Sequence, residues 1–276
     1  MRKIWRRSAL FFSMTLVPVS LAGHAESHYS GPSPVKDEPT WVLVGAGDIA
    51  DCRGLGGAEA TAKLLDQIPG TVMAVGDLAY PPGRHPAIMN SMPGGTPYFD
   101  YFGALAGEPK TGYYSYDLGS WHCKDVGGCE SGSPQQRWLR ADLASHPVAC
   151  TLAYWHKPLF SSGSAHGNDL AMKPLWDALY DANADVVVNG HDHDYERFAP
   201  QTPDGVSDAV RGIREFVVGT GGKNLRPFGT AKPNSEVRDF SAFGVLKLIL
   251  KPNGYDWQFI PEEGKTFTDS GSGVCH

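Results

Sequence analysis

The sequence contains no basic stripe and no apolar run long enough to cross a membrane. Its 24 Lys and Arg residues are outnumbered by 30 Asp and Glu residues, which gives a formal net charge of −6. Nucleic-acid binding draws much of its affinity from clustered positive charge, so we expect no nucleic-acid partner. The apolar stretch 8–22 is shorter than a membrane-spanning helix requires, so we also expect no stable membrane anchor.

The N-terminal region is typical of an export signal. Residues 2–7 carry four positive charges, residues 8–22 are mostly apolar, and Gly23-His24-Ala25 ends in small residues suited to cleavage. This pattern predicts a signal peptide over 1–25 and a secreted or periplasmic protein. Residues 26–40 are polar and contain three prolines, which indicates a flexible lead-in. Residues 41–276 show no internal repeat or further linker and are interpreted as one domain.

Cysteine is scarce, with five residues in 276, and in an exported protein these residues favour disulfides. Cys123 and Cys129 are close enough in sequence to close a small loop. Cys150 is expected either to pair with Cys275 or to be a buried thiol within its strand. Cys52 has no obvious mate.

Short apolar runs bounded by turn residues alternate with segments of helical spacing. The pattern predicts an α/β core with a parallel portion, followed by a mixed or antiparallel sheet. Strands are expected at 41–46, 71–75, 112–118, 148–155, 186–188, 214–218, 243–251 and 255–260, and helices at 57–67, 133–145 and 170–182.

Four of the predicted strands end at side chains that can bind a metal ion. These side chains are Asp48, Asp77, His156, and the pair His191 and His193. Each alone has an ordinary alternative as a turn or loop residue, but strand ends of one sheet converge in space. Carboxylates mixed with imidazoles suit Fe, Zn or Mn. Five ligands are too many for one catalytic metal with an open position, so they favour two metals about 3.5–4 Å apart with a bridging carboxylate. Enzymes use this arrangement for in-line displacement at phosphorus.

Four motifs surround these candidate ligands. In order, they are Gly47-Asp48-Ile49-Ala50, Gly76-Asp77-Leu78-Ala79-Tyr80, Tyr154-Trp155-His156-Lys157-Pro158 and Gly190-His191-Asp192-His193. They resemble the motifs of the calcineurin-like metallophosphoesterases, and Tyr80, three residues after Asp77, resembles the purple acid phosphatase branch. The resemblance runs from about residue 41 to residue 276 and implies a four-layer αββα sandwich of two mixed β-sheets flanked by helices.

The resemblance also implies a role for each ligand. Asp48, Asp77, Tyr80 and His193 would hold a ferric ion, and Asp77 would bridge to a second metal, Zn, Mn or Fe. His156 and His191 would hold that second metal. The implied activity is that of an acid phosphatase, a hydrolase in which metal hydroxide attacks phosphate monoesters of small phosphorylated substrates.

The chain departs from the family because it has no Gly-Asn-His motif, which normally supplies an amide ligand and a histidine that assists the leaving group. Asn90 is a candidate for the amide ligand, and His85 is a candidate stand-in for the catalytic histidine. The intervals 77–98 and 121–123 are short for the family. We hypothesise a shortened member that lacks a loop and one core strand.

Because this histidine is absent, we expect weak phosphomonoesterase activity that favours substrates with good leaving groups, such as aryl phosphates. Two alternatives remain open. One is a non-catalytic metal- or phosphate-binding protein on the same scaffold, and the other is a phosphodiesterase or nucleotidase of the same superfamily.

Overall fold

The computed structural model describes residues 39–51, 53–80, 114–118, 121–125 and 130–276. The predicted signal peptide and most of the lead-in lie outside these residues, as do Cys52, His85, Asn90 and Cys129. Residues 38–276 form one compact unit. No helix within the described residues is long and apolar enough to cross a membrane.

The first β-sheet has five strands and mixed direction. Strand β1 pairs in parallel with β3 on one side and antiparallel with β12 on the other. In spatial order, its strands are β14 (Ser270–Val274), β13 (Gly254–Pro261), β12 (Gly244–Lys251), β1 (Trp41–Ala46) and β3 (Thr71–Ala74).

The second β-sheet has seven strands and is also mixed. Four adjacent strands, β6, β7, β8 and β10, run parallel, and their outer neighbours run antiparallel to them. In spatial order, its strands are β11 (Ser235–Asp239), β9 (Tyr195–Phe198), β10 (Arg214–Val218), β8 (Val186–Asn189), β7 (Cys150–Tyr154), β6 (Trp121–Asp125) and β5 (Tyr114–Leu118). A separate parallel pair joins β2 (Ala50–Asp51) and β4 (Ala79–Tyr80).

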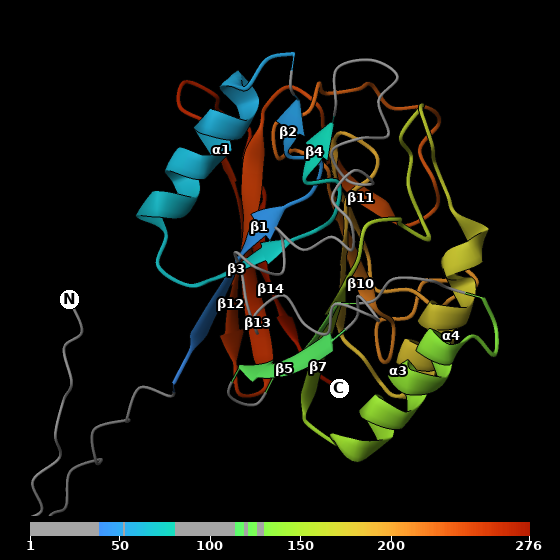
Figure 1. Ribbon diagram of the computed structural model, residues 1–276. Helices are drawn as coiled ribbons and strands as arrows, with labels where there is room; N and C mark the ends of the chain where they lie inside the picture. Colours follow the sequence, from blue (N-terminus) through green and yellow to red (C-terminus); the bar gives the residue numbers. More distant parts are fainter. Residues whose placement is uncertain (1–38, 52, 81–113, 119–120, 126–129) are drawn as a thin grey trace, which may run out of the picture. The chain divides into compact units, whose positions relative to one another are not determined.

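Helices cover the outer faces of the two sheets (Figure 1). Helix α1 (Gly56–Gln67) lies on the β1–β12 sheet, whereas α3 (Pro134–Ser145) and α4 (Lys173–Asp181) lie on the β7–β8 sheet. Side chains of β8 alternate accordingly: Val186 and Val188 pack between the sheets, and Val187 packs beneath α3 and α4. The structure therefore confirms the predicted four-layer αββα sandwich of two mixed sheets.

Local sequence signals explain the helix ends. Ser133 caps α3, because its hydroxyl accepts a hydrogen bond from the Gln136 N–H at 3.1 Å, and Pro134 occupies the first turn. The helix expected over 170–182 is divided into a 3₁₀ turn (Leu170–Met172) and α4. Pro174 accounts for the new start, because a proline without an N–H is tolerated in a first turn but not inside a helix.

Six strands were not predicted from the sequence: the two-residue strands β2 and β4, and strands β6, β9, β11 and β14. Strands β9, β11 and β14 are short and polar or glycine-rich, and they form because neighbouring strands supply hydrogen-bonding partners. Strand β6 lies parallel to β7 at residues 121–125, so the hypothesis that a core strand is missing there is wrong. The proposed loop shortening between Asp77 and Tyr98 falls largely outside the described residues.

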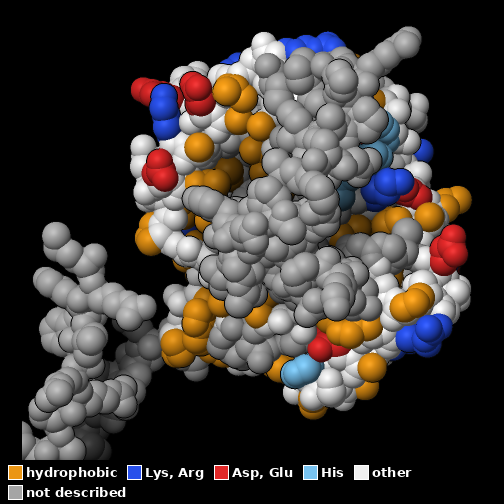
Figure 2. All heavy atoms as spheres, viewed as in Figure 1, with side chains coloured by type: hydrophobic (Ala, Val, Ile, Leu, Met, Phe, Trp, Pro, Cys, Tyr) orange, Lys and Arg blue, Asp and Glu red, His pale blue; other side chains and the backbone are white. Residues whose placement is uncertain are grey.

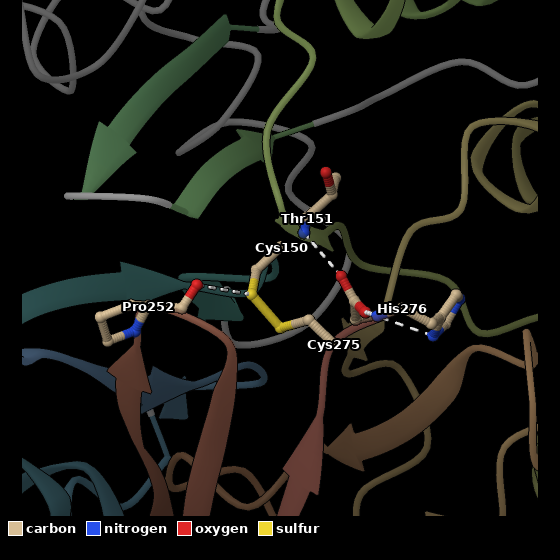
Figure 3. The surroundings of a disulfide bond; sticks show 6 residues. Cys150, Thr151, Pro252, Cys275 and His276 are labelled. Atoms are coloured by element: carbon tan, nitrogen blue, oxygen red, sulfur yellow. Dashed lines mark hydrogen bonds and ion pairs between the residues drawn. A yellow bond between two sulfur atoms is a disulfide. The ribbon is translucent and has the colours of Figure 1, made fainter.

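A disulfide joins Cys150, at the start of β7, to Cys275, just after β14 (Figure 3). It links the two sheets across a sequence separation of 125 residues. Of the two alternatives for Cys150, the structure shows the disulfide with Cys275. The tentative pairing of Cys123 with Cys129 stays a prediction, because it lies outside the described residues.

Candidate metal centre

The candidate ligands meet where the carboxyl ends of strands from both sheets come together. Asp48 follows β1 and Asp77 follows β3, whereas His156 follows β7 and His191 follows β8. Backbone hydrogen bonds link these ends: the Gly47 N–H donates to the Val218 carbonyl at 2.9 Å, and the Gly190 N–H donates to the His156 carbonyl at 2.9 Å. The position of the site thus follows directly from the strand order.

One group of contacts is formed by Asp48, Tyr80 and His193. The Tyr80 hydroxyl donates a short hydrogen bond to Asp48 Oδ1 and lies 3.4 Å from His193 Nε2. The same His193 nitrogen lies 3.4 Å from Asp48 Oδ1, and both of these residues are buried. The other Asp48 oxygen accepts the His191 N–H at 2.7 Å, which fixes the carboxylate's orientation.

A second group is formed by Asp77, His156 and His191. His156 Nε2 lies 3.4 Å from Asp77 Oδ2 and 3.1 Å from His191 Nδ1. The two groups touch, because one donor atom from each of Asp48, Asp77 and His156 lies within 4.8 Å of the others. The structure therefore brings together all six of the predicted ligands that lie within the described residues.

Backbone strain is concentrated at these residues. Five non-glycine residues in the described part of the chain have a positive φ, and three of them are Asp48 (58°), Asp77 (44°) and His191 (74°). Such conformations cost on the order of 1–3 kcal/mol each and persist where the surrounding structure enforces them, often at functional sites. Gly190 allows the close approach, since a Cβ there would lie 2.7 Å from Asp48 Oδ2.

Two backbone carbonyls orient the imidazoles. His156 Nδ1 lies 3.1 Å from the Val75 carbonyl oxygen, and His193 Nδ1 lies 2.8 Å from the Asn224 carbonyl oxygen. Each carbonyl can accept only an N–H, so Nδ1 donates to it and Nε2 faces the pocket. Metal-binding histidines commonly have this arrangement.

The ionisation of the site reflects its crowding. The hydrogen bond to His156 lowers the pKa of Asp77 to about 2, and burial lowers the pKa of His191 to about 4. Burial opposes protonation of His156, but its contacts with Asp77 and Asp48 prevail and raise its pKa. Burial, with Asp48 and Asp77 close by, raises the pKa of Tyr80. An ionised Asp77 carboxylate beside a neutral His191 is a suitable pair of donors for cations.

Sequence reasoning missed two residues beside the site, His166 and Arg226. The His166 ring stacks on His191 with centroids 4.0 Å apart, and its Nε2 lies 3.1 Å from Arg226 Nη1. Asp192, which is buried, holds this loop by accepting the N–H groups of His166 (3.1 Å) and Gly167 (2.9 Å). The available signal was His166-Gly167-Asn168 in a Ser- and Gly-rich stretch shortly after His156.

The donor set fits a pair of metal ions of the kind that the sequence predicts. It combines carboxylate, phenol and imidazole groups, which are typical of Fe, Zn and Mn sites. Asp77 lies between the two groups, since its carboxylate is close to both His156 and Tyr80. This position suits the bridging role that the family resemblance implies for Asp77. His85 and Asn90, the two weaker candidates, lie outside the described residues.

No protein-family model matches the chain. Among curated proteins, purple acid phosphatase 21 of Arabidopsis thaliana is 35% identical over 172 residues, which cover 57% of this chain and 39% of that protein. The chain spans less than half the length of the curated relatives it matches.

Two solved structures share the fold. A purple acid phosphatase, PPD1, from yellow lupin (Lupinus luteus) has a TM-score of 0.65 at 18% identity, covering 85% of this chain and 54% of its own. GAP50, described as the anchor in the inner membrane complex of Plasmodium, has a TM-score of 0.60 at 15% identity, covering 86% of this chain and 89% of its own.

Proposed function

We propose that this relative of the purple acid phosphatases, with its calcineurin-like metallophosphoesterase fold, is an exported hydrolase of phosphate monoesters that uses two metal ions. The observation that supports this most directly is the convergence of two carboxylates, a phenol and three imidazoles at strand ends of both sheets. The metals would be iron together with Zn, Mn or a second iron.

The residue roles follow from the two contact groups. Asp48, Tyr80 and His193 would hold the ferric ion, His156 and His191 the second metal, and Asp77 would bind both. Bound metals would supply Lewis-acid activation of water and charge neutralisation at the phosphate. The protein's own contribution is rigidity, because carbonyls at Val75 and Asn224 fix the imidazoles before any substrate binds.

Leaving-group protonation requires an acid beside the metal pair, and His166 is suitably placed for it. Its ring is exposed and stacked on His191, so it borders the candidate site without being held among the ligands. An alkyl leaving group needs such a proton more than an aryl one, because the alkoxide is the stronger base. We therefore expect the enzyme to favour aryl phosphates, with His166 supporting slower turnover of alkyl esters.

The test is a kinetic comparison of wild type and His166→Ala, each with its metal content measured. The variant should lose about a hundredfold in kcat on an alkyl phosphate and much less on an aryl phosphate. Equal losses of kcat on both substrates would show that His166 does not protonate the leaving group. Wild-type protein that holds two metals but turns over neither ester would reject the proposed hydrolase.

A non-catalytic role is the second candidate, because GAP50 is described as an anchor and shares this fold across most of both chains. Metal content without turnover on any ester would favour it. A phosphodiesterase or nucleotidase would instead be revealed by faster turnover of a diester or a nucleotide than of an aryl monoester.

A further inference from the structure

Arg226 is a positively charged side chain fixed beside the candidate metal centre. Its backbone N–H donates to the His193 carbonyl at 2.9 Å, so the residue is attached directly to the ligand-bearing segment. Its side chain is half-buried, and Nη1 lies 3.1 Å from His166 Nε2. Figure 2 shows histidine side chains lying next to Lys or Arg side chains on this face.

The charge of Arg226 is not neutralised within the described residues. Other basic side chains close to the fold's polar clusters have carboxylate partners: Lys223 pairs with Asp51 at 2.6 Å, and Arg197 pairs with Asp269 at 2.6 Å. No described carboxylate pairs with Arg226, and the side-chain contact it makes is with an imidazole. A guanidinium without a carboxylate partner among the described residues is suited to binding an anion, because it offers a rigid fork of donors.

The geometry separates this charge from the reacting phosphate. Arg226 contacts His166, and His166 in turn stacks on His191, so the guanidinium lies beyond the ring that borders the ligands. We propose that Arg226, aided by His166, binds a second phosphate group on the leaving-group side of the substrate. The inference rests on the proposed phosphoesterase function and narrows it to bisphosphorylated or otherwise doubly phosphorylated substrates.

The test uses two substrates that differ only in the second phosphate, hydroquinone monophosphate and hydroquinone bisphosphate. Hydrolysis of the bisphosphate breaks one P–O ester bond with water and releases orthophosphate and hydroquinone monophosphate. Wild type should prefer the bisphosphate by about tenfold in kcat/KM after correction for its two equivalent phosphates, because a charge-assisted contact is worth about this much. The preference should lie mainly in KM.

Arg226→Gln should abolish this preference, and Arg226→Lys should restore part of it through the remaining charge. Arg140→Gln is the matched control, because Arg140 lies on α3 in a surface ion pair with Asp181 at 3.0 Å and should keep the wild-type ratio.

Equal losses by Arg226→Gln on both substrates would overturn the inference, since they would show that Arg226 only positions His166. A wild type active on both esters without preference would also overturn it while leaving the proposed hydrolase intact. Metal-loaded wild type inactive on both would reject the hydrolase and this inference together.

Discussion

Strands β7 and β8 have side chains that can bind a metal ion at both of their ends. The two ends differ in what those side chains contact. Past their carboxyl ends, His156 and His191 face each other and the Asp77 carboxylate. At their amino ends, Cys150 and Asp185 form a second cluster with Cys275 whose donor atoms also lie within 4.8 Å of one another. Similar residue types therefore meet twice in the same pair of strands.

In the amino-end cluster, the side chains that could bind a metal already bind one another or the backbone. Cys150 and Cys275 are joined to each other, and Asp185 accepts the Thr151 N–H at 2.7 Å and the His276 N–H at 3.0 Å (Figure 3). At the carboxyl end, by contrast, Asp48 accepts hydrogen bonds from Tyr80 and His191, but the site residues are not covalently joined, and imidazole nitrogens of His156 and His191 face each other. Clustering alone is thus a poor guide to a metal site. What distinguishes the two ends is that two of the three donor atoms at the amino end are already joined in a disulfide.

The largest expected effect comes from removing the shared carboxylate. Asp77→Asn should lose both metals in large part and lower kcat/KM on an aryl phosphate by more than about a hundredfold, because even residues that only support ligands cost 10–100-fold. Metal analysis and the aryl phosphate assay measure this. Asp185→Asn is the matched control at the other end and should keep wild-type metal content. Loss of metal from both variants would contradict the proposal that only the carboxyl end binds metal.

Removing the disulfide should reduce stability without affecting chemistry. Cys150→Ser combined with Cys275→Ser should lower the free energy of unfolding by about 2–4 kcal/mol, since the bond closes a loop across 125 residues. Chemical denaturation measures the loss. Turnover by the folded variant at 25 °C should match wild type, and a parallel loss of bound metal would show instead that the two ends are coupled.

The proposed contact of Tyr80 with iron would give the carboxyl end a spectroscopic signature that the disulfide end cannot produce. A phenolate bound to ferric iron absorbs visible light, so Tyr80→Phe should lose its purple colour while retaining iron through the remaining ligands. Absorption spectra with metal analysis test this. Tyr180→Phe is the control, because that hydroxyl bonds Asp208 at 2.7 Å on the surface. Colour that survives in Tyr80→Phe would assign the iron to other donors.

The last expected effect is a pH dependence of stability at the amino end. Burial raises the pKa of Asp185 to about 7, above the ordinary 3.8 of the unfolded chain. Between these values the folded state holds the proton that the unfolded state releases, so this residue's contribution to stability falls as pH rises from about 4 to 7.

The slope from one such group is at most about 1.4 kcal/mol per pH unit. Asp185→Asn should flatten it, as measured by urea denaturation at several pH values. His276 Nδ1 lies 3.3 Å from Asp185 Oδ1, and the pKa of His276 is itself lowered, chiefly by burial, so both proteins are compared in a His276→Gln background, where this group does not titrate. An unchanged slope in the variant would mean that Asp185 is ionised in the folded protein.

Much of the site was predictable because its residues follow strong local signals. Asp48, Asp77, His156 and the His191-His193 pair each come directly after an apolar strand, and strand ends converge in any sheet of this type. Arg226 and His166 have no such signal, since both lie in loops whose position is set by distant contacts such as those of Asp192. Strands β11 and β14 escaped prediction for the same reason, because neighbouring strands define them.

Hydrophobic periodicity predicted most of the strands and helices, and the ends of those strands predicted five candidate ligands, because both signals are properties of short segments. The four-layer order and the candidate ligand Tyr80 came from the family resemblance of the same motifs. Only the tertiary structure decided which of these side chains already bind one another in the folded protein. Cys150 forms a disulfide with Cys275 instead of remaining a thiol, and Arg226 lies beside His166 with no carboxylate partner among the described residues. Such outcomes depend on distances between residues far apart in the chain, which no local pattern encodes.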